Sequence, residues 1–150
     1  MRALLQRVSS ASVTIAGETA SSINTGFLVL LGITNGDDPT DTEWLCGKIA
    51  RMRVFEDDDG KMNRSILDNS GDILVVSQFT LHASTKKGNR PSFLDAAAAA
   101  VSEPLYDSFC ETLSAELGKP VARGIFGADM KVCLTNDGPV TIWIDSRNRE

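Results

Sequence analysis

The order of hydrophobic and polar residues along the chain predicts several strands. Residues 9–17 alternate apolar and polar side chains, which is the pattern of a strand with one buried face. Residues 26–34 form a continuous apolar run, which is typical of a strand buried on both faces. Residues 72–82, DILVVSQFTLH, have the most strand-like composition in the chain, and residues 121–145 are rich in strand formers interrupted by glycines.

Two segments instead repeat apolar residues at the spacing of a helix. In residues 38–55, Thr40 and Glu43 also match a capping box at the start of the helix. A second helix is expected to begin near Ser102 and to end at Gly118, because glycine commonly terminates helices.

Strands therefore predominate, and the two helices lie between groups of strands. We expect an α+β fold with a mainly antiparallel, barrel-like sheet and two principal helices. The elements do not alternate regularly enough for a doubly wound nucleotide-binding fold, and neither a GxGxxG motif nor a P-loop is present. The length of 150 residues suits a single domain over residues 1–150.

Composition indicates a cytoplasmic protein. The hydrophobic content of 42% and the charged content of 23% are ordinary for a globular chain. No segment is apolar for long enough to be a membrane span or a signal peptide, so no membrane partner is expected. Cys46, Cys110 and Cys133 are odd in number and lie in separate apolar stretches, which predicts reduced, buried thiols.

The charge of the chain limits its partners. A net charge of −5 argues against broad contact with duplex phosphates, so no DNA partner is expected. Binding to one end of an RNA remains compatible with this charge, because a few local lysines and arginines are sufficient.

Common hydrolytic side-chain chemistry finds little support in the sequence. His82 is the sole histidine, which excludes a His-rich metal site, and neither a metal nor a cofactor is expected. On a continuous strand, the separation of Ser77 from His82 puts their side chains on opposite faces. Thr80 and His82 share a face but lie roughly 7 Å apart, too far for a hydrogen bond of about 3 Å. No nucleophile with an adjacent base is therefore predicted.

The segment SQFTL, residues 77–81, places several polar groups directly after an apolar run. On a strand, Ser77 and Phe79 face one side, whereas Gln78 and Thr80 face the other. The simplest interpretation is a half-buried strand with Gln78 and Thr80 on its solvated face. A functional wall made of the same residues is the alternative.

Gly138-Pro139 interrupts a run of strand-forming residues. A turn between two strands is the ordinary explanation, since DG is a common hairpin signal. Only about 5–6% of X–Pro bonds are cis. A cis Gly-Pro peptide would hold two neighbouring carbonyls in fixed, nearly parallel directions, where they could accept hydrogen bonds from an ammonium group.

The two segments together resemble a known family. SQFTL and, later in the chain, NDGPVT resemble the signature pair of the D-aminoacyl-tRNA deacylases. Asn89 departs from the pattern, because another basic residue is expected there. The supporting matches are QRV at 6–8, KGNRPSF at 87–93, FGADM at 126–130 and the length of the chain.

The resemblance implies an α+β homodimer with its active sites at the subunit interface. The implied reaction is hydrolysis of the ester that joins a D-amino acid to the 3′-terminal adenosine of tRNA. In the family the Gly-Pro peptide is cis and is offered by one subunit to the pocket of the other. Gly138 and Pro139 would capture the α-amino group through main-chain oxygens and reject L-amino acids. Glycine has no side chain to reject, so glycyl-tRNA mischarged on tRNA-Ala is an implied substrate as well.

The family pattern assigns roles to further residues. Ser77, Gln78, Phe79 and Thr80 match the pocket wall near the adenosine and the ester, and backbone N–H groups near Phe79 and Thr80 are candidates to stabilise the oxyanion. The ribose 2′-OH of the substrate would assist attack by water, and Thr80 as a nucleophile is the weaker alternative.

Residues outside SQFTL are assigned to binding. Met130 and Phe126 would be apolar neighbours of the site, and Arg7 would hold the Gly-Pro loop. The alternatives are ordinary core residues for Met130 and Phe126, which spacing alone does not exclude, and a strand-surface charge for Arg7. The candidates for contact with RNA phosphates, which a solvated loop would equally explain, are Lys86, Lys87 and Arg90.

Two other functions stay open. The chain could be a related deacylase that removes an L-amino acid from mischarged tRNA, or a non-catalytic module that binds the tRNA 3′ end. By resemblance, Phe79 and the SQ at the start of the motif favour the D-specific branch.

Overall fold

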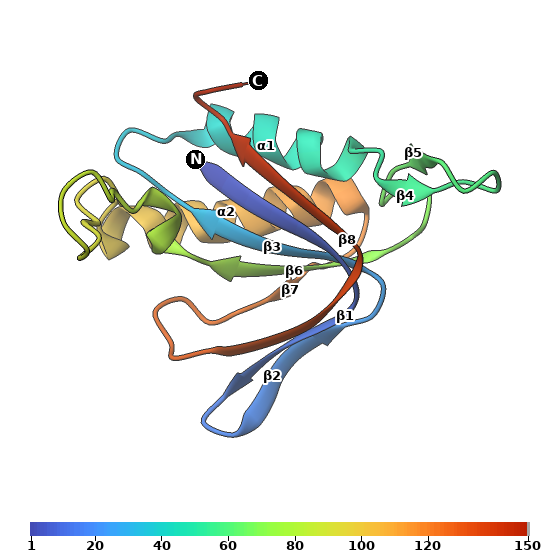
Figure 1. The fold of residues 1–150 in the computed structure, drawn as a ribbon, viewed down its shortest axis with the longest axis horizontal. Coiled ribbons are helices and arrows are strands. Elements are labelled where there is room, and N and C mark those ends of the chain that lie inside the picture. Colours follow the sequence, from blue (N-terminus) through green and yellow to red (C-terminus); the bar gives the residue numbers. More distant parts are fainter. Residues whose placement is uncertain (150) are drawn as a thin grey trace.

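The structure is a computed structural model that describes residues 1–149, and it contains a strongly curved sheet with helices packed against one face (Figure 1). A separate pair of short strands forms a hairpin beside the first helix. The strands are β1 (Arg2–Ile15), β2 (Glu18–Ile23), β3 (Gly26–Gly32), β4 (Phe55–Glu56), β5 (Met62–Arg64), β6 (Asp72–Ser77), β7 (Ala122–Arg123) and β8 (Lys131–Asp145). The helices are α1 (Pro39–Arg51), the 3-10 turn η1 (Phe79–His82) and α2 (Ala99–Leu117).

Strand β1 organises the main sheet. It pairs antiparallel with β2, β3 and β8, whereas β3 pairs parallel with β6, and β6 with β7. The sheet curls until β2 contacts β6 and β7, so it is a nearly closed barrel. The predicted α+β class and the two principal helices are confirmed. The sheet is mixed rather than mainly antiparallel, because α1 and α2 each lie in a crossover between parallel neighbours.

Both predicted helices are present, but their starts differ from the sequence prediction. Pro39 occupies the first turn of α1, and the carboxylate of Asp38 accepts hydrogen bonds from the N–H groups of Thr40 and Asp41. The capping box is therefore Asp38 with Asp41, and the predicted pair Thr40 with Glu43 is wrong. Helix α2 ends at Gly118 as predicted, with Gly118 in the left-handed conformation (φ 70°).

Two apolar clusters form the core. One fills the space between the helices and the sheet and includes Leu45, Phe109 and Leu113, while the other lies inside the barrel and includes Val8 and Leu74. Within residues 1–149, no helix is long and apolar enough to cross a membrane. The expectation of one domain over residues 1–150 stays a prediction.

The three cysteines do not share one environment. Cys46 and Cys110 are buried, and burial raises the pKa of the Cys110 thiol to about 11. Cys133 is exposed, so the prediction of three buried thiols is wrong for this residue. At the start of β8 exposed and half-buried positions alternate, and Cys133 falls on the exposed side.

Candidate active site

The segment SQFTL is not a continuous strand. Strand β6 ends at Ser77, and the N–H of Gln78 makes a last hydrogen bond to the carbonyl of Leu31 at 2.7 Å. The chain then forms the η1 turn, which is closed by a hydrogen bond from the N–H of Leu81 to the carbonyl of Gln78. The alternating faces predicted for residues 77–82 are therefore wrong beyond Ser77.

Gly32, the last residue of β3, allows this turn to pack directly on the sheet. A β-carbon at residue 32 would lie 2.9 Å from Cβ of Leu81 and 3.0 Å from the carbonyl oxygen of Gln78. Both contacts are closer than van der Waals packing permits. Any larger residue at position 32 would push the turn away from β3.

A cavity of about 360 Å³ opens beside the turn. Ser77, Gln78 and Phe79 line one side, and Phe126 and Met130 line another from the segment between β7 and β8. The fold thus brings together five of the residues predicted for the site, although they come from distant parts of the sequence. Further lining residues include Leu31, Ile33, Ala97, Ser102 and Val132.

Two residues that sequence reasoning missed shape this cavity. The buried hydroxyl of Tyr106 on α2 donates to the carbonyl of Val75 at 2.9 Å, and its ring packs 5.9 Å from that of Phe126. Gly124 provides space for Met130, since a β-carbon there would lie 2.7 Å from the Met130 sulfur. The available signals were the single tyrosine of the chain and a glycine just before FGADM.

The polar groups near the cavity do not form an acid–base pair. Thr80 is exposed, and its hydroxyl accepts a hydrogen bond from the amide of Gln78 at 2.5 Å. His82 is buried, and burial lowers its pKa, which favours the neutral ring. Asp129 is the one carboxylate among the lining residues, but it is 87% exposed and pairs with Lys131. Within residues 1–149, no group of three His, Cys, Asp or Glu residues is placed to hold a metal ion.

Gly138 and Pro139 lie in a bulge of β8, so they are not a turn between two strands. Gln6 of β1 pairs with Thr141, and Val8 pairs with Asn136, so residues 137–140 lie opposite Arg7 alone. The Gly138–Pro139 peptide bond is cis, and both residues are exposed. Neither residue is among those that line the cavity beside η1.

Arg7 holds this bulge. Its side chain is buried, its Nε donates to the carbonyl of Asp137 at 3.0 Å, and its Nη1 donates to the carbonyl of Val54 at 2.5 Å. Gly138 has a φ of 118°, and a β-carbon there would lie 2.8 Å from Nη2 of Arg7. The strand-surface alternative for Arg7 is therefore wrong, and glycine at position 138 leaves room for the guanidinium.

The basic loop adjoins the same cavity. Lys86, Lys87 and Arg90 are exposed in a loop whose two ends are joined by backbone hydrogen bonds between Ser84 and Ser92. At the base of this loop, the ring of Phe93 packs edge-on against Phe79, with 5.2 Å between centroids. The candidate phosphate contacts thus extend from the wall of the cavity, and their role stays a prediction.

Comparison with known proteins identifies the family. The family model described as D-Tyr-tRNA(Tyr) deacylase matches residues 4–145. D-aminoacyl-tRNA deacylases from Bacteroides thetaiotaomicron and Opitutus terrae are 59% and 58% identical to this chain over 150 residues, which is 100% of both chains in each case.

Solved structures have the same fold. One described as c-Myc DNA Unwinding Element Binding Protein has a TM-score of 0.90 at 45% identity and covers 97% of this chain and 98% of its own. Another, described as a probable eukaryotic D-amino acid tRNA deacylase, has a TM-score of 0.82 at 20% identity, with 95% and 97% covered.

These relatives show that the chain is, in its broad class, a hydrolase that acts on aminoacyl-tRNA. More specifically, it belongs to the D-Tyr-tRNA(Tyr) deacylase family, and its activity is that of a D-aminoacyl-tRNA deacylase.

The contacts of Arg7 predict the effect of replacing its guanidinium group with an ammonium group. In Arg7→Lys one ammonium cannot reach both Asp137 and Val54, so a buried carbonyl loses its charged donor. We expect a loss of about 1–3 kcal/mol in the free energy of unfolding. We also expect a fall of at least about 10²-fold in kcat/KM for D-tyrosyl-tRNA, because the bulge is displaced. Urea unfolding and a deacylation assay measure the two effects.

Arg53→Lys is the matched control for this prediction, because Arg53 is exposed and near Val54. It should leave both quantities within error. An Arg7→Lys protein with unchanged kcat/KM would contradict the role assigned to the arginine.

Proposed function

We propose that the chain hydrolyses the ester of D-aminoacyl-tRNA and of glycyl-tRNA mischarged on tRNA-Ala, and spares L-aminoacyl-tRNA. The observation that supports the proposal most is that the chain has both a cavity beside η1 and an exposed bulge at Gly138-Pro139, which Arg7 fixes in place. The single-stranded 3′ end of the tRNA is the part that would enter the cavity. The reaction would take place in the cytoplasm.

The selection between D- and L-amino acids would rest on main-chain atoms. The carbonyl oxygens of Gly138 and Pro139 would accept hydrogen bonds from the α-ammonium group of the substrate. A main-chain receptor of this kind cannot move aside as a side chain can, so an L-side chain would meet fixed backbone. Glycine would pass, because it has no side chain on either side of its α-carbon.

We further propose that the bulge acts on the cavity of a second copy. Gly138 and Pro139 are exposed and lie outside the cavity of their own subunit, so a homodimer would complete each site. Strand β8 supports this proposal, because among residues 1–149 it pairs only with β1, and its other edge is available to a partner.

Positioning, rather than a side-chain base, would supply the chemistry. His82 is buried with a lowered pKa, and Asp129 is exposed and paired with Lys131, so neither suits the role of a general base. The substrate's own 2′-OH would assist attack by water at the ester. The N–H groups of Phe79 and Thr80 open the η1 turn and are candidates to stabilise the oxyanion, since the first N–H groups of a helix lack partners within it.

The central experiment compares matched D-tyrosyl-tRNA, L-tyrosyl-tRNA and glycyl-tRNA-Ala as substrates. We expect hydrolysis of the D- and glycyl esters and a kcat/KM for the L-ester lower by at least about 10²-fold. Release of the labelled amino acid measures the three rates. Cleavage of the L-ester alone would favour the related L-deacylase, and binding without any cleavage would favour a non-catalytic tRNA-end module.

Thr80→Ala separates the two mechanisms. Within residues 1–149 the Thr80 hydroxyl is hydrogen-bonded to the Gln78 amide and to no base, so we expect kcat to stay within about threefold of the unaltered chain. A substrate ending in 2′-deoxyadenosine should instead react slower by about 10²–10⁴-fold, since it lacks the assisting hydroxyl. Single-turnover rates test both changes. A large fall in kcat for Thr80→Ala, together with a normal rate for the 2′-deoxyadenosine substrate, would support Thr80 as the nucleophile.

Replacing Lys86, Lys87 and Arg90 by alanine tests the phosphate contacts. For single-stranded RNA, each lost phosphate contact makes the negative slope of log binding constant against log salt concentration shallower by about 0.7, so a combined change of about 2 is expected. The KM for D-tyrosyl-tRNA should rise while kcat changes little. Arg53→Ala with Lys61→Ala is the control, because the β4–β5 region lies at the opposite end of the molecule (Figure 1). An unchanged slope would mean that the loop is only a solvated loop.

A further inference from the structure

The α-amino group of Met1 is buried in an ion pair. Its nitrogen lies 2.7 Å from Oδ1 of Asp37 and 2.8 Å from Oγ of Ser146, and the side chains of Met1 and Asp37 are both 0% exposed. The Met1 side chain itself belongs to the core cluster between the helices and the sheet. The first residues of most domains are loosely held at the surface, so this arrangement is unusual.

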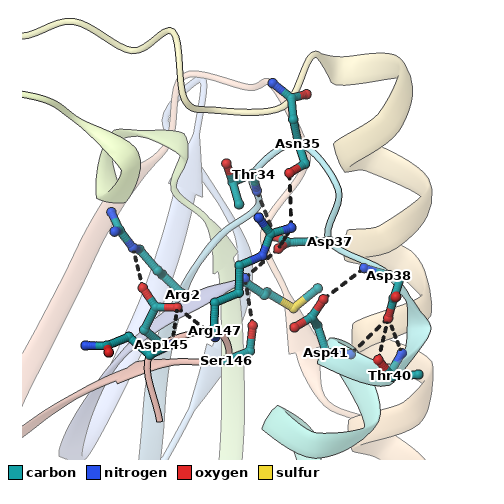
Figure 2. A network of polar contacts seen from close by, with 12 residues as sticks. Arg2, Thr34, Asn35, Asp37, Asp38, Thr40, Asp41, Asp145, Ser146 and Arg147 are labelled. Atoms are coloured by element: carbon teal, nitrogen blue, oxygen red, sulfur yellow. Dashed lines mark hydrogen bonds and ion pairs between the residues drawn. The ribbon is translucent and has the colours of Figure 1, made fainter. Parts of the chain in front are cut away.

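Asp37 is held from several directions. Its Oδ2 accepts the N–H of Thr34 at 2.8 Å, and Nη2 of Arg147 lies 3.0 Å from Oδ1. On the other side of Met1, the N–H of Ser146 donates to the Met1 carbonyl at 2.9 Å. The first residue therefore joins the loop between β3 and α1 to the segment that follows β8. Asp37 in that loop and Ser146 and Arg147 in that segment lie close together in Figure 2.

The next residue extends this network to the candidate active site. Nη1 of Arg2 donates to the carbonyl of Leu81 at 3.0 Å, and its Nε pairs with Asp145 at 2.8 Å. Leu81 belongs to η1, which also carries Phe79 and Thr80. The hydrogen bond from Arg2 to Leu81 thus couples the position of this turn to the positions of the first two residues.

We propose that the free, positively charged α-amino group of Met1 is a structural cation that completes the fold, so the chain reaches its working form only when this group carries no acyl group. An acylated nitrogen has no charge and at most one N–H, whereas two acceptors face it here. The buried Asp37 carboxylate would lose its closest cation, and the added carbonyl would have to enter a fully buried space.

A reaction class follows from this requirement. Where synthesis begins with N-formylmethionine, water must first hydrolyse the formamide C–N bond. That hydrolysis releases formate, and the amine formed takes up a proton. Such a deformylation has to precede the docking of β1 against Asp37, and Nα-acetylation has to be absent. The effect on stability is independent of the proposed function, while the effect through Arg2 and η1 rests on it.

Chemical labelling of the unaltered protein tests the proposal directly. An amine-acetylating reagent is applied near neutral pH, and the Met1 peptide is followed by mass spectrometry in the folded chain and in urea. Free α-amines as a class react readily at this pH. We expect the folded Met1 amine to react at least about 10-fold more slowly than the unfolded one. Equal rates would overturn the proposal.

A removable fusion tests the consequence. A domain fused before Met1, and cut by a protease that leaves Met1 with a free amine, gives both forms of one chain. We expect the fused or Nα-acetylated form to melt roughly 10 °C lower, because a buried ion pair is broken. Asp129→Asn, which breaks an exposed ion pair, is the control and should change the melting temperature by less than about 2 °C.

The Asp37→Asn variant distinguishes loss of the ion pair from simple crowding. In this background the fusion should lower the melting temperature by less than half as much, because the partner carboxylate is already absent. The proposal would be overturned if the fusion lowered the melting temperature of Asp37→Asn as much as that of the unaltered chain. It would also be overturned if the fused and free forms of the unaltered chain melted at the same temperature. If neither form cleaved any aminoacyl-tRNA while the melting difference persisted, the proposed function would fail and this inference would stand.

Discussion

The pairing of β1 with β2, β3 and β8 is the constraint on which the rest of the structure depends. The first half of β1 lies between β3 and β8, so it fixes both neighbours at once. Strand β3 ends at Gly32, against which η1 packs, and β8 carries the bulge that Arg7 holds. The two parts of the candidate site thus take their positions from a single strand and not from the loops that connect them.

Local patterns in the sequence are sufficient for much of this fold. The apolar run that became β3, the helical spacing in α1 and α2, and the glycine that ends α2 all depend on neighbouring residues, and all are present. The end of β6 could not be predicted in this way. Residues 78–82 leave the strand because Gln78 makes its last ladder bond to Leu31 and Gly32 admits the turn, and both partners lie far upstream.

The candidate site was accessible to sequence reasoning only in part. A charged residue such as Arg7 is by default placed on the surface, yet its guanidinium is buried because main-chain carbonyls of Asp137 and Val54 satisfy it. The Gly-Pro pair looked like a turn, because a bulge and a turn share the same local residues and differ only in the partner strand. The resemblance to a family directed attention to these positions, whereas composition and periodicity left them undecided.

The polar groups around the cavity explain why the position of the backbone matters so much for the proposed reaction. Within residues 1–149, the Thr80 hydroxyl bonds to the Gln78 amide, His82 is buried, and the carboxylate of Asp129 is exposed and paired, so none of these three side chains suits proton transfer. Under the mechanism proposed above, catalysis depends on the geometry in which the substrate is held, and small displacements of the backbone are then costly. The backbone here is held by interior contacts: Arg7 on the bulge, Tyr106 on β6, and Arg2 on η1. Substitutions in these contacts should therefore affect the reaction more than most substitutions in the cavity wall.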